Sequence, residues 1–317
     1  MNTRDIVRKA WQITQVHLKK LLLYGFIPAF FSIVISSIYF AYQYHAFKTS
    51  SLFSDTPTDS NVITTAKTIW GVVSSHPSFT VTLLVILAIL VLGYVILPAI
   101  FRGTMIQAVE KIRQYEPIQG SMEIGVRRFF PMFEFGILMG AFSITTLFTE
   151  SSFILRWWGE NIFFLALPVL LFVAMVGLVL NFLFTYAEFY IVLEKKPIIR
   201  AFMDSTILVI SNLRRTFLIF VLILLISVRI ILNVILVLLI PMLIVFLSTY
   251  FTSFLSSTLG WSLIGVFGLL IVGVSSYLLA LFHIFTTSVW VLTFAIISGK
   301  EKEKIHDVDL ATDEVAH

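Results

Sequence analysis

Six long apolar stretches dominate the chain, and each is long enough to cross a membrane. They cover residues 21–42, 78–101, 129–148, 161–193, 216–248 and 263–297. A hydrocarbon core about 30 Å thick requires about 20 helical residues, and the last three stretches exceed that length. Tilt, kinks at proline residues and helix ends that leave the bilayer would account for the excess. The pattern therefore predicts an all-α polytopic membrane protein with six transmembrane helices.

Shorter amphipathic segments precede three of these stretches. The clearest is 195–215, in which one helical stripe is polar (Arg200, Asp204, Ser211, Arg215) and the opposing stripe is apolar (Ile198, Phe202, Val209, Leu213). Residues 3–20 follow the same pattern, and 102–128 follows it less clearly. A basic amphipathic helix of this kind lies in the membrane interface rather than across the bilayer. We therefore expect three interfacial helices on one side of the membrane.

The basic pairs at the ends of these segments suggest an internal repeat. Lys19-Lys20, Arg127-Arg128 and Arg214-Arg215 are each followed at once by an apolar stretch. The repeats would cover 3–101, 102–193 and 195–297, each an interfacial helix followed by a transmembrane hairpin. The alternative is that basic pairs at the cytoplasmic mouth of a span follow from the positive-inside rule alone.

Composition agrees with a membrane location. Hydrophobic residues make up 58% of the 317 residues, charged residues 13%, and the mean hydropathy is +0.97. A soluble domain could not cover that much apolar surface. The chain is expected to form one integral-membrane domain over 1–298, with a disordered charged tail over 299–317. The net charge of +4 lies in short segments between helices, so we do not interpret it as a nucleic-acid footprint.

The distribution of Lys and Arg predicts the orientation. Of the 22 Lys and Arg residues, only Lys48, Lys67 and Arg156 fall on the side opposite the amphipathic segments, and Arg229 falls within a span. The positive-inside rule then places both termini in the cytoplasm. The location expected is a prokaryotic cytoplasmic membrane.

One segment resembles a known group of proteins. Ala201-Phe202, Ser205, Leu208 and Asn212 precede the basic mouth of a long span. This pattern is similar to poorly characterised bacterial multi-pass membrane families, including the membrane domain fused to some glycerophosphodiester phosphodiesterases. The phosphodiesterase half of such fusions is absent, so the resemblance implies no hydrolase activity.

Polar residues inside the apolar stretches form a candidate cluster, because a charge in hydrocarbon is expensive. Arg229 lies about 20 Å from the cytoplasmic end of its span at 1.5 Å per residue. The full candidate set is Arg229, Asn233, Asn181, His283, Glu134 and Glu188. One interpretation is a polar site near the membrane midplane that serves a substrate or proton path. The other is that Arg229 pairs with a glutamate or with backbone carbonyls and only holds the helices together.

The sequence carries no catalytic signature. It contains no phosphate-binding glycine loop, no HExxH and no GxSxG, and the absence of cysteine excludes thiolate chemistry. We therefore expect no enzymatic activity, no cofactor and no metal site. The leading hypothesis is a membrane scaffold or accessory protein that grips the anionic cytoplasmic leaflet and acts with a protein partner. The alternative is a transporter or lipid-handling protein with a polar site around Arg229. The side chains expected to contact lipid headgroups are Lys19, Lys20, Arg127, Arg128, Lys195, Lys196, Arg200, Arg214 and Arg215.

Overall fold

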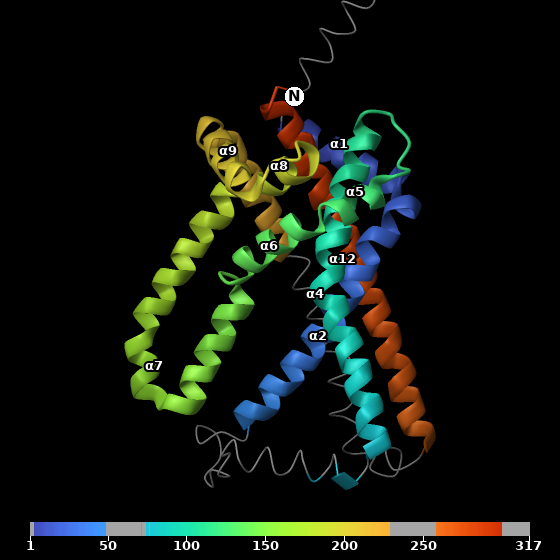
Figure 1. The fold of residues 1–317 in the computed structure, drawn as a ribbon, viewed down its shortest axis with the longest axis vertical. Coiled ribbons are helices and arrows are strands. Elements are labelled where there is room, and N and C mark those ends of the chain that lie inside the picture. The colour runs from blue at the N-terminus through green and yellow to red at the C-terminus, as the bar shows by residue number, and fades with distance from the viewer. Residues whose placement is uncertain (1–2, 49–70, 72–73, 76, 229–257, 300–317) are drawn as a thin grey trace, which may run out of the picture. The chain divides into compact units, whose positions relative to one another are not determined.

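The computed structural model describes residues 3–48, 71, 74–75, 77–228 and 258–299, and every regular element within them is a helix (Figure 1). The elements in chain order are α1 (Thr3–Val16), α2 (Leu18–Lys48), α4 (Pro77–Arg113), α5 (Ser121–Arg127), α6 (Phe129–Gly140), α7 (Ile144–Leu183), α8 (Ala187–Leu193), α9 (Ile198–Ser211) and α12 (Thr258–Ile297). A further helical segment, Leu213–Val228, follows α9. The spacing of Ile63, Ile69, Trp70 and Val73 predicts a short surface helix in the loop after the first span, and of residues 63–73 the structure describes only residue 71.

Four described helices are long and apolar enough to cross a membrane, and a bent pair gives a fifth. The four are Leu18–Phe40, Thr80–Arg113, Ile144–Leu183 and Gly265–Ile297, and the pair is Ile198–Ser211 with Leu213–Val228. The chain is therefore a helical protein with the features of a multi-pass membrane protein. The expected stretch 216–248 is described only as far as Val228, and the remainder lies outside the described residues.

Helix α4 extends well past the predicted end of the second span. Residues 102–113 continue the same helix instead of starting an interfacial one, and α5 covers only Ser121–Arg127. The prediction treated the change from apolar to charged residues as a helix boundary. Nothing in 102–113 stops a helix, whereas Pro117 and Gly120 interrupt the chain before α5. Gly120 has a φ of 79°, a left-handed conformation that glycine adopts without strain.

The predicted third and fourth spans are both interrupted. Helix α6 ends at Gly140, and the backbone N–H of Thr146 donates to the hydroxyl of Ser143 at 3.1 Å, which caps the start of α7. Helix α7 ends at Leu183, so α8 is a separate helix. Its turn is stabilised from outside, because the Ser205 hydroxyl donates to the Leu183 carbonyl and accepts from the Tyr186 N–H.

Helix α7 consists of two arms that meet at Gly159. Gly159 has φ 81° and ψ 176°, which no helix contains. A Cβ added at Gly177 would lie 2.7 Å from the Cβ of Phe142, so the second arm returns to the level where the first begins. The arms form an antiparallel helical hairpin, visible in Figure 1. The first arm covers most of the residues between the predicted third and fourth spans, 129–148 and 161–193, which the sequence did not predict to be helical.

By its internal contacts the chain divides into two compact units. The first comprises residues 1–30, 99–135 and 182–317, and the second comprises 31–98 and 136–181. In the second unit a short polar chain joins α2 to the first arm of α7. Gln43 donates to the hydroxyl of Tyr39 and accepts a hydrogen bond from Ser152 at 2.8 Å. Gln43 and Ser152 are both buried, so this network is fully paired as a buried polar group requires.

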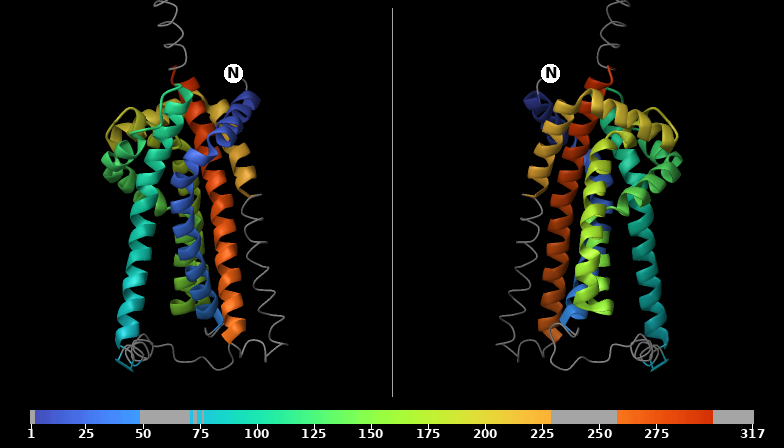
Figure 2. Two further views of the ribbon diagram at one scale, coloured as in Figure 1. Left: turned by 90° about the vertical axis from the view of Figure 1, so that its right-hand side faces the viewer. Right: turned by 90° about the vertical axis from the view of Figure 1, so that its left-hand side faces the viewer.

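The first unit contains the short helices α1, α5 and α9, which we call the cap. Helix α1 lies across the end of α12 (Figures 1 and 2). Ile6, Ala10 and Ile13 of α1 are buried against Phe285, Val289 and Leu292 of α12. The apolar face of α1 therefore packs against protein, whereas the sequence suggested that it faces lipid.

Each cap helix ends at a single break residue before the next helix. The break residues are His17, Arg128 and Asn212. The backbone N–H of each break residue donates to the backbone carbonyl of the residue four positions earlier. Its own carbonyl accepts from the backbone N–H of the residue four positions later, and all of these bonds measure 2.9–3.1 Å. Three equivalent positions around each break are buried, namely those seven residues before, three residues before and four residues after it. They are Ala10, Thr14 and Leu21 around His17, Ser121, Gly125 and Met132 around Arg128, and Ser205, Val209 and Thr216 around Asn212.

The helix breaks change how the second proposed repeat aligns with the other two. When the basic pairs are aligned, Arg128 matches Lys20 and Arg215, but when the helix breaks are aligned, it matches His17 and Asn212. The shift of three residues arises because basic pairs mark the depth of the chain in the membrane, and not the position at which a helix turns.

Close contact between α4 and α5 generates a prediction. A Cβ on Gly125 would lie 2.6 Å from the Ile100 carbonyl oxygen and 2.9 Å from the Thr104 nitrogen, both backbone atoms. Gly125→Ala must therefore push the two helices apart, and we expect it to lower the free energy of unfolding by about 1–3 kcal/mol. Thermal unfolding in lipid nanodiscs, followed by tryptophan fluorescence, measures this change.

The matched control is Gly136→Ala. A Cβ at Gly136 meets no atom within 4 Å among the described residues, and alanine favours a helix over glycine. Equal melting temperatures for the two variants would contradict the close packing of α5 on α4.

Candidate functional site

The structure describes four of the six residues of the predicted polar cluster. Arg229 and Asn233 lie outside the described residues, so the alternative hypothesis of a transport site around Arg229 stays a prediction. Asn181, in the second unit, donates to the Gly177 carbonyl of its own helix at 2.9 Å. Glu134 is exposed on α6 and has no ion-pair partner among the described residues.

Glu188 and His283 both lie near a residue that the sequence analysis did not select, Arg102. The Nε of Arg102 on α4 donates to Oε2 of Glu188 on α8 at 2.6 Å. The Glu188 side chain is 9% exposed and that of Arg102 is 60% exposed. His283 of α12 lies within electrostatic range of Arg102. An ion pair thus joins α4 to α8, and the charge of Arg102 also acts on His283 of α12.

Arg102 was missed because it was counted as one of many cytoplasmic charges. Arg102 differs from the other cytoplasmic basic residues because it directly follows the apolar stretch of α4 and lies inside the same continuous helix. Glu188 lies in the first turn of α8, where the helix dipole stabilises a negative charge. Sequence reasoning placed Glu188 inside a span and considered Arg229 as the partner of a glutamate, whereas the partner observed for Glu188 is Arg102.

The rest of α8 anchors Glu188 firmly. All six residues from Ala187 to Val192 are buried. Phe189 stacks on Phe294 of α12 with ring centroids 5.6 Å apart, and Tyr190 meets the same ring edge-on at 5.0 Å. Such aromatic pairs contribute about 0.5–1.5 kcal/mol each beyond the area they bury. The carboxylate of Glu188 therefore projects from a rigid platform.

Tyr186 connects this platform to the cap. Its side chain is fully buried, and its hydroxyl shares a hydrogen bond of 3.1 Å with Thr216, four residues after the Asn212 break. Its backbone N–H donates to Ser205 of α9 at 3.1 Å. One residue thus links α8, α9 and the helix that follows α9.

Lys196 has a structural role as well. Its Nζ lies 2.8 Å from both Glu194 and Asp204 and 4.6 Å above the ring of Tyr190. The hydrogen bonds to Asp204 and Glu194 raise the pKa of Lys196 above that of an ordinary lysine. Lys196 therefore bonds within the protein and is not free to contact a headgroup in the way the sequence suggested.

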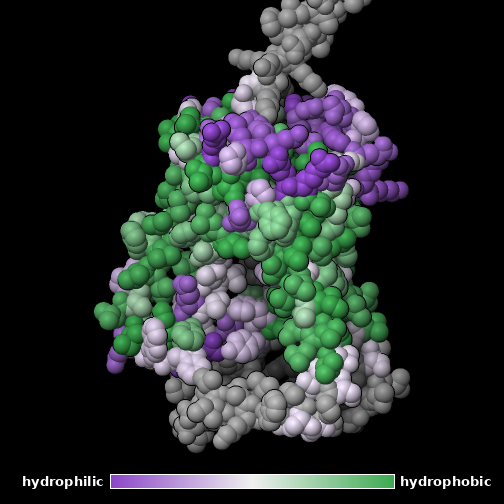
Figure 3. All heavy atoms as spheres, viewed as in Figure 1, coloured by the Kyte–Doolittle hydropathy of each residue, from purple (hydrophilic) through white to green (hydrophobic). Residues whose placement is uncertain are grey.

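The other predicted headgroup contacts differ in exposure. Arg128 and Arg215 are half-buried, and the exposed residues are Lys19, Lys20, Arg127, Lys195, Arg200 and Arg214. Arg127 pairs with Glu123 one turn away on α5. In Figure 3 hydrophilic residues gather over the cap.

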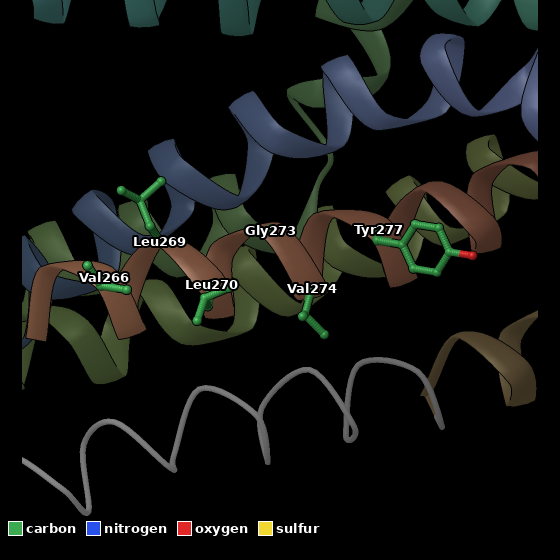
Figure 4. Close-up of a pocket in the computed structure, with 6 residues that line it drawn as sticks. All are labelled: Val266, Leu269, Leu270, Gly273, Val274 and Tyr277. Atoms are coloured by element: carbon green, nitrogen blue, oxygen red, sulfur yellow. The ribbon is translucent and has the colours of Figure 1, made fainter. Parts of the chain in front are cut away.

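The described residues offer little other chemistry. They contain no group of three or more His, Asp or Glu side chains placed to hold a metal ion. A shallow apolar pocket along α12 is lined by Val266, Leu269, Leu270, Gly273, Val274 and Tyr277 (Figure 4). The Arg102–Glu188 pair, with its neighbour His283, is therefore the candidate functional site.

No protein-family model, curated protein or solved structure matches this chain. The resemblance to the membrane domain fused to glycerophosphodiester phosphodiesterases stays a prediction. Ala201 and Ser205, two of the residues that carry it, are buried against the rest of the first unit.

The bond between Tyr186 and Thr216 generates a second prediction. Tyr186→Phe keeps the ring and removes only the buried hydroxyl, so the free energy of unfolding should fall by about 1 kcal/mol. The measurement is the denaturant or thermal midpoint in a fixed detergent. Tyr277→Phe on α12 is the control, since its side chain is more exposed and it should leave the midpoint unchanged. A Tyr186→Phe variant as stable as the parent would show that this bond does not stabilise the cap.

Proposed function

We propose that the chain is a non-enzymatic, multi-pass membrane scaffold or accessory protein, and that its cap grips the anionic cytoplasmic leaflet. The observation that carries this proposal is the outer face of α9. Ile199, Met203, Ile207 and Ile210 form a stripe along one side of α9, and each is 60–75% exposed. A soluble surface rarely displays such a stripe, whereas an interfacial helix requires one.

The stripe lies on a different side of α9 from the one the sequence suggested. Phe202, expected in the lipid-facing stripe, instead stacks on Phe184 with ring centroids 4.2 Å apart, and Val209 is fully buried. The protein-facing side of α9 is formed by Ala201, Ser205 and Val209. Small residues on that side allow close approach to α8, and the large apolar residues are left to face the lipid.

The direction of α9 supports an interfacial placement. The helix axis turns by 100° between Ile198–Ser211 and Leu213–Val228. If the second segment crosses the bilayer, the first lies nearly in the membrane plane. Leu213 and Phe217 are also more than half exposed, so the apolar surface continues from α9 onto the spanning segment.

Charge supplies the attraction to an anionic leaflet. Lys195, Arg200 and Arg214 are exposed at the ends and side of α9, and Lys19 and Lys20 are exposed just after the His17 break. A basic residue near an anionic surface contributes about 1 kcal/mol of attraction. Helix α1 differs, because most of its apolar face is covered by α12, and its exposed side mixes Arg4, Arg8, Gln12 and Gln15 with Trp11 and Val16. We therefore assign the main lipid-inserting stripe to α9.

The internal repeat also belongs to this proposal. Within the first unit, α4 packs on α5, α8 packs on α9, and α12 packs on α1. Each returning helix thus contacts the cap helix of the next proposed repeat, and the last contacts the first. When the second and third proposed repeats are aligned so that Arg128 matches Asn212, Glu110-Lys111 also matches Glu194-Lys195. These two observations favour the three proposed repeats, and the six crossings and cytoplasmic termini are proposed from hydropathy and from the distribution of Lys and Arg.

Depth measurements test the placement of α9. The chain has no cysteine, so a nitroxide can be attached at Met203→Cys or Ile207→Cys without background. We expect both labels to collide with oxygen, which concentrates in lipid, and to be shielded from a water-soluble nickel chelate.

Gln12→Cys provides the matched control. Gln12 is exposed on the polar face of α1, so its label should show the reverse, with strong nickel collisions. Equal nickel accessibility at positions 207 and 12 would contradict the proposal that α9 inserts into the leaflet.

A further inference from the structure

Arg102 has donor capacity that its ion pair does not use. Glu188 accepts a hydrogen bond from Nε alone. The two terminal nitrogens of the guanidinium have no partner among the described residues, and the side chain is 60% exposed. A guanidinium held by one nitrogen presents its other edge in a fixed direction, which suits bidentate contact with a planar or tetrahedral oxyanion.

The position of Arg102 on α4 indicates what lies opposite that edge. The helix is apolar and exposed from Val81 to Val95, as expected for a segment in hydrocarbon. Charged residues resume only at Arg102 and continue to Arg113. Arg102 therefore lies where the hydrocarbon meets the headgroups, and the oxyanion most abundant at that depth is phosphate.

The local charge selects between kinds of phosphate. The carboxylate of Glu188 neutralises Arg102 and is held in place by the buried helix α8. A ligand that carries a single negative charge adds less repulsion with Glu188 than one that carries two. The site therefore favours a phosphodiester, with one charge, over a phosphate monoester or free inorganic phosphate.

We propose that Arg102, oriented by Glu188, binds the phosphodiester of an anionic phospholipid at the junction of α4, α8 and α12. This inference rests on the proposed placement of the cap at the cytoplasmic leaflet. A lipid bound there holds together helices that the chain brings from three separate regions. Glu188 acts as a positioning residue, and Arg102 contacts the ligand.

Native mass spectrometry of the full chain released from phosphatidylglycerol nanodiscs tests the site. We expect one retained lipid per chain, and we expect Arg102→Gln to reduce its occupancy about tenfold, the effect of losing a hydrogen bond to a charged group. Arg113→Gln is the control, because Arg113 on the same helix α4 also pairs with a glutamate, Glu110, but within that helix, and it is not among the predicted headgroup contacts. Loss of the lipid in both variants, or in neither, would overturn the proposal.

A second variant guards against misfolding. Arg102→Gln leaves Glu188 buried without a partner, so Arg102→Gln is also combined with Glu188→Gln, which removes both charges. We expect the double variant to melt like the parent and still to lose the lipid. A double variant that folds and retains the lipid would overturn the proposal.

Two further measurements separate the alternatives. Millimolar inorganic phosphate should not displace the lipid, and displacement would show that the site takes free phosphate instead of a phosphodiester. The nitroxide at position 207 is measured in the same Arg102→Gln sample. If the label at position 207 is exposed to lipid and the variant still retains its bound lipid, only the Arg102 site is rejected. If the label is exposed to water, the proposed function of the cap is rejected.

Discussion

Backbone hydrogen bonding is the constraint on which this structure depends. In hydrocarbon an unpaired N–H or C=O costs several kcal/mol, so a chain that turns from the membrane plane into the bilayer must do so without leaving such groups unpaired. At His17, Arg128 and Asn212 the backbone bonds continue on both sides of the break. The helix changes direction while its polar groups stay paired, and this allows short cap helices to join long apolar ones with no intervening loop.

Close packing at each break then depends on small residues. Ala10, Ser121 and Ser205 lie seven residues before their breaks, and all are fully buried. A small side chain lets a returning helix approach the cap helix closely, and membrane helices associate through such contacts because lipid gives no hydrophobic driving force. Ser205 adds a second role, since its hydroxyl satisfies both ends of the turn between α7 and α8. The position seven residues before the break thus provides space for close packing at Ala10 and also hydrogen bonds at Ser205.

The sequence predicted the helical class and the presence of several membrane-length apolar helices, because length and hydropathy depend on the bilayer and not on tertiary contacts. It located α1 and α9 from their amphipathic periodicity. It could not decide which apolar face of α9 meets lipid, since Phe202 and Met203 are equally apolar and only tertiary packing distinguishes them. The continuation of α4 to Arg113 was missed because a change in polarity does not end a helix. Arg102 was overlooked because the positive-inside rule explains any cytoplasmic arginine, and only the three-dimensional approach of α8 shows that this one is paired.

The Arg102–Glu188 pair is costly to maintain unless it does more than stabilise. Burying the carboxylate of Glu188 incurs a desolvation penalty that an ion pair often fails to repay, and apolar residues of similar volume are frequently as stable. The half-exposed partner weakens the pair further, because water screens the guanidinium. A purely structural contact would gain more from an apolar residue at Glu188, which already lies among buried aromatic rings. A glutamate at this position is better explained by the orientation it imposes on Arg102, whose open edge then points in one direction at the level of the headgroups.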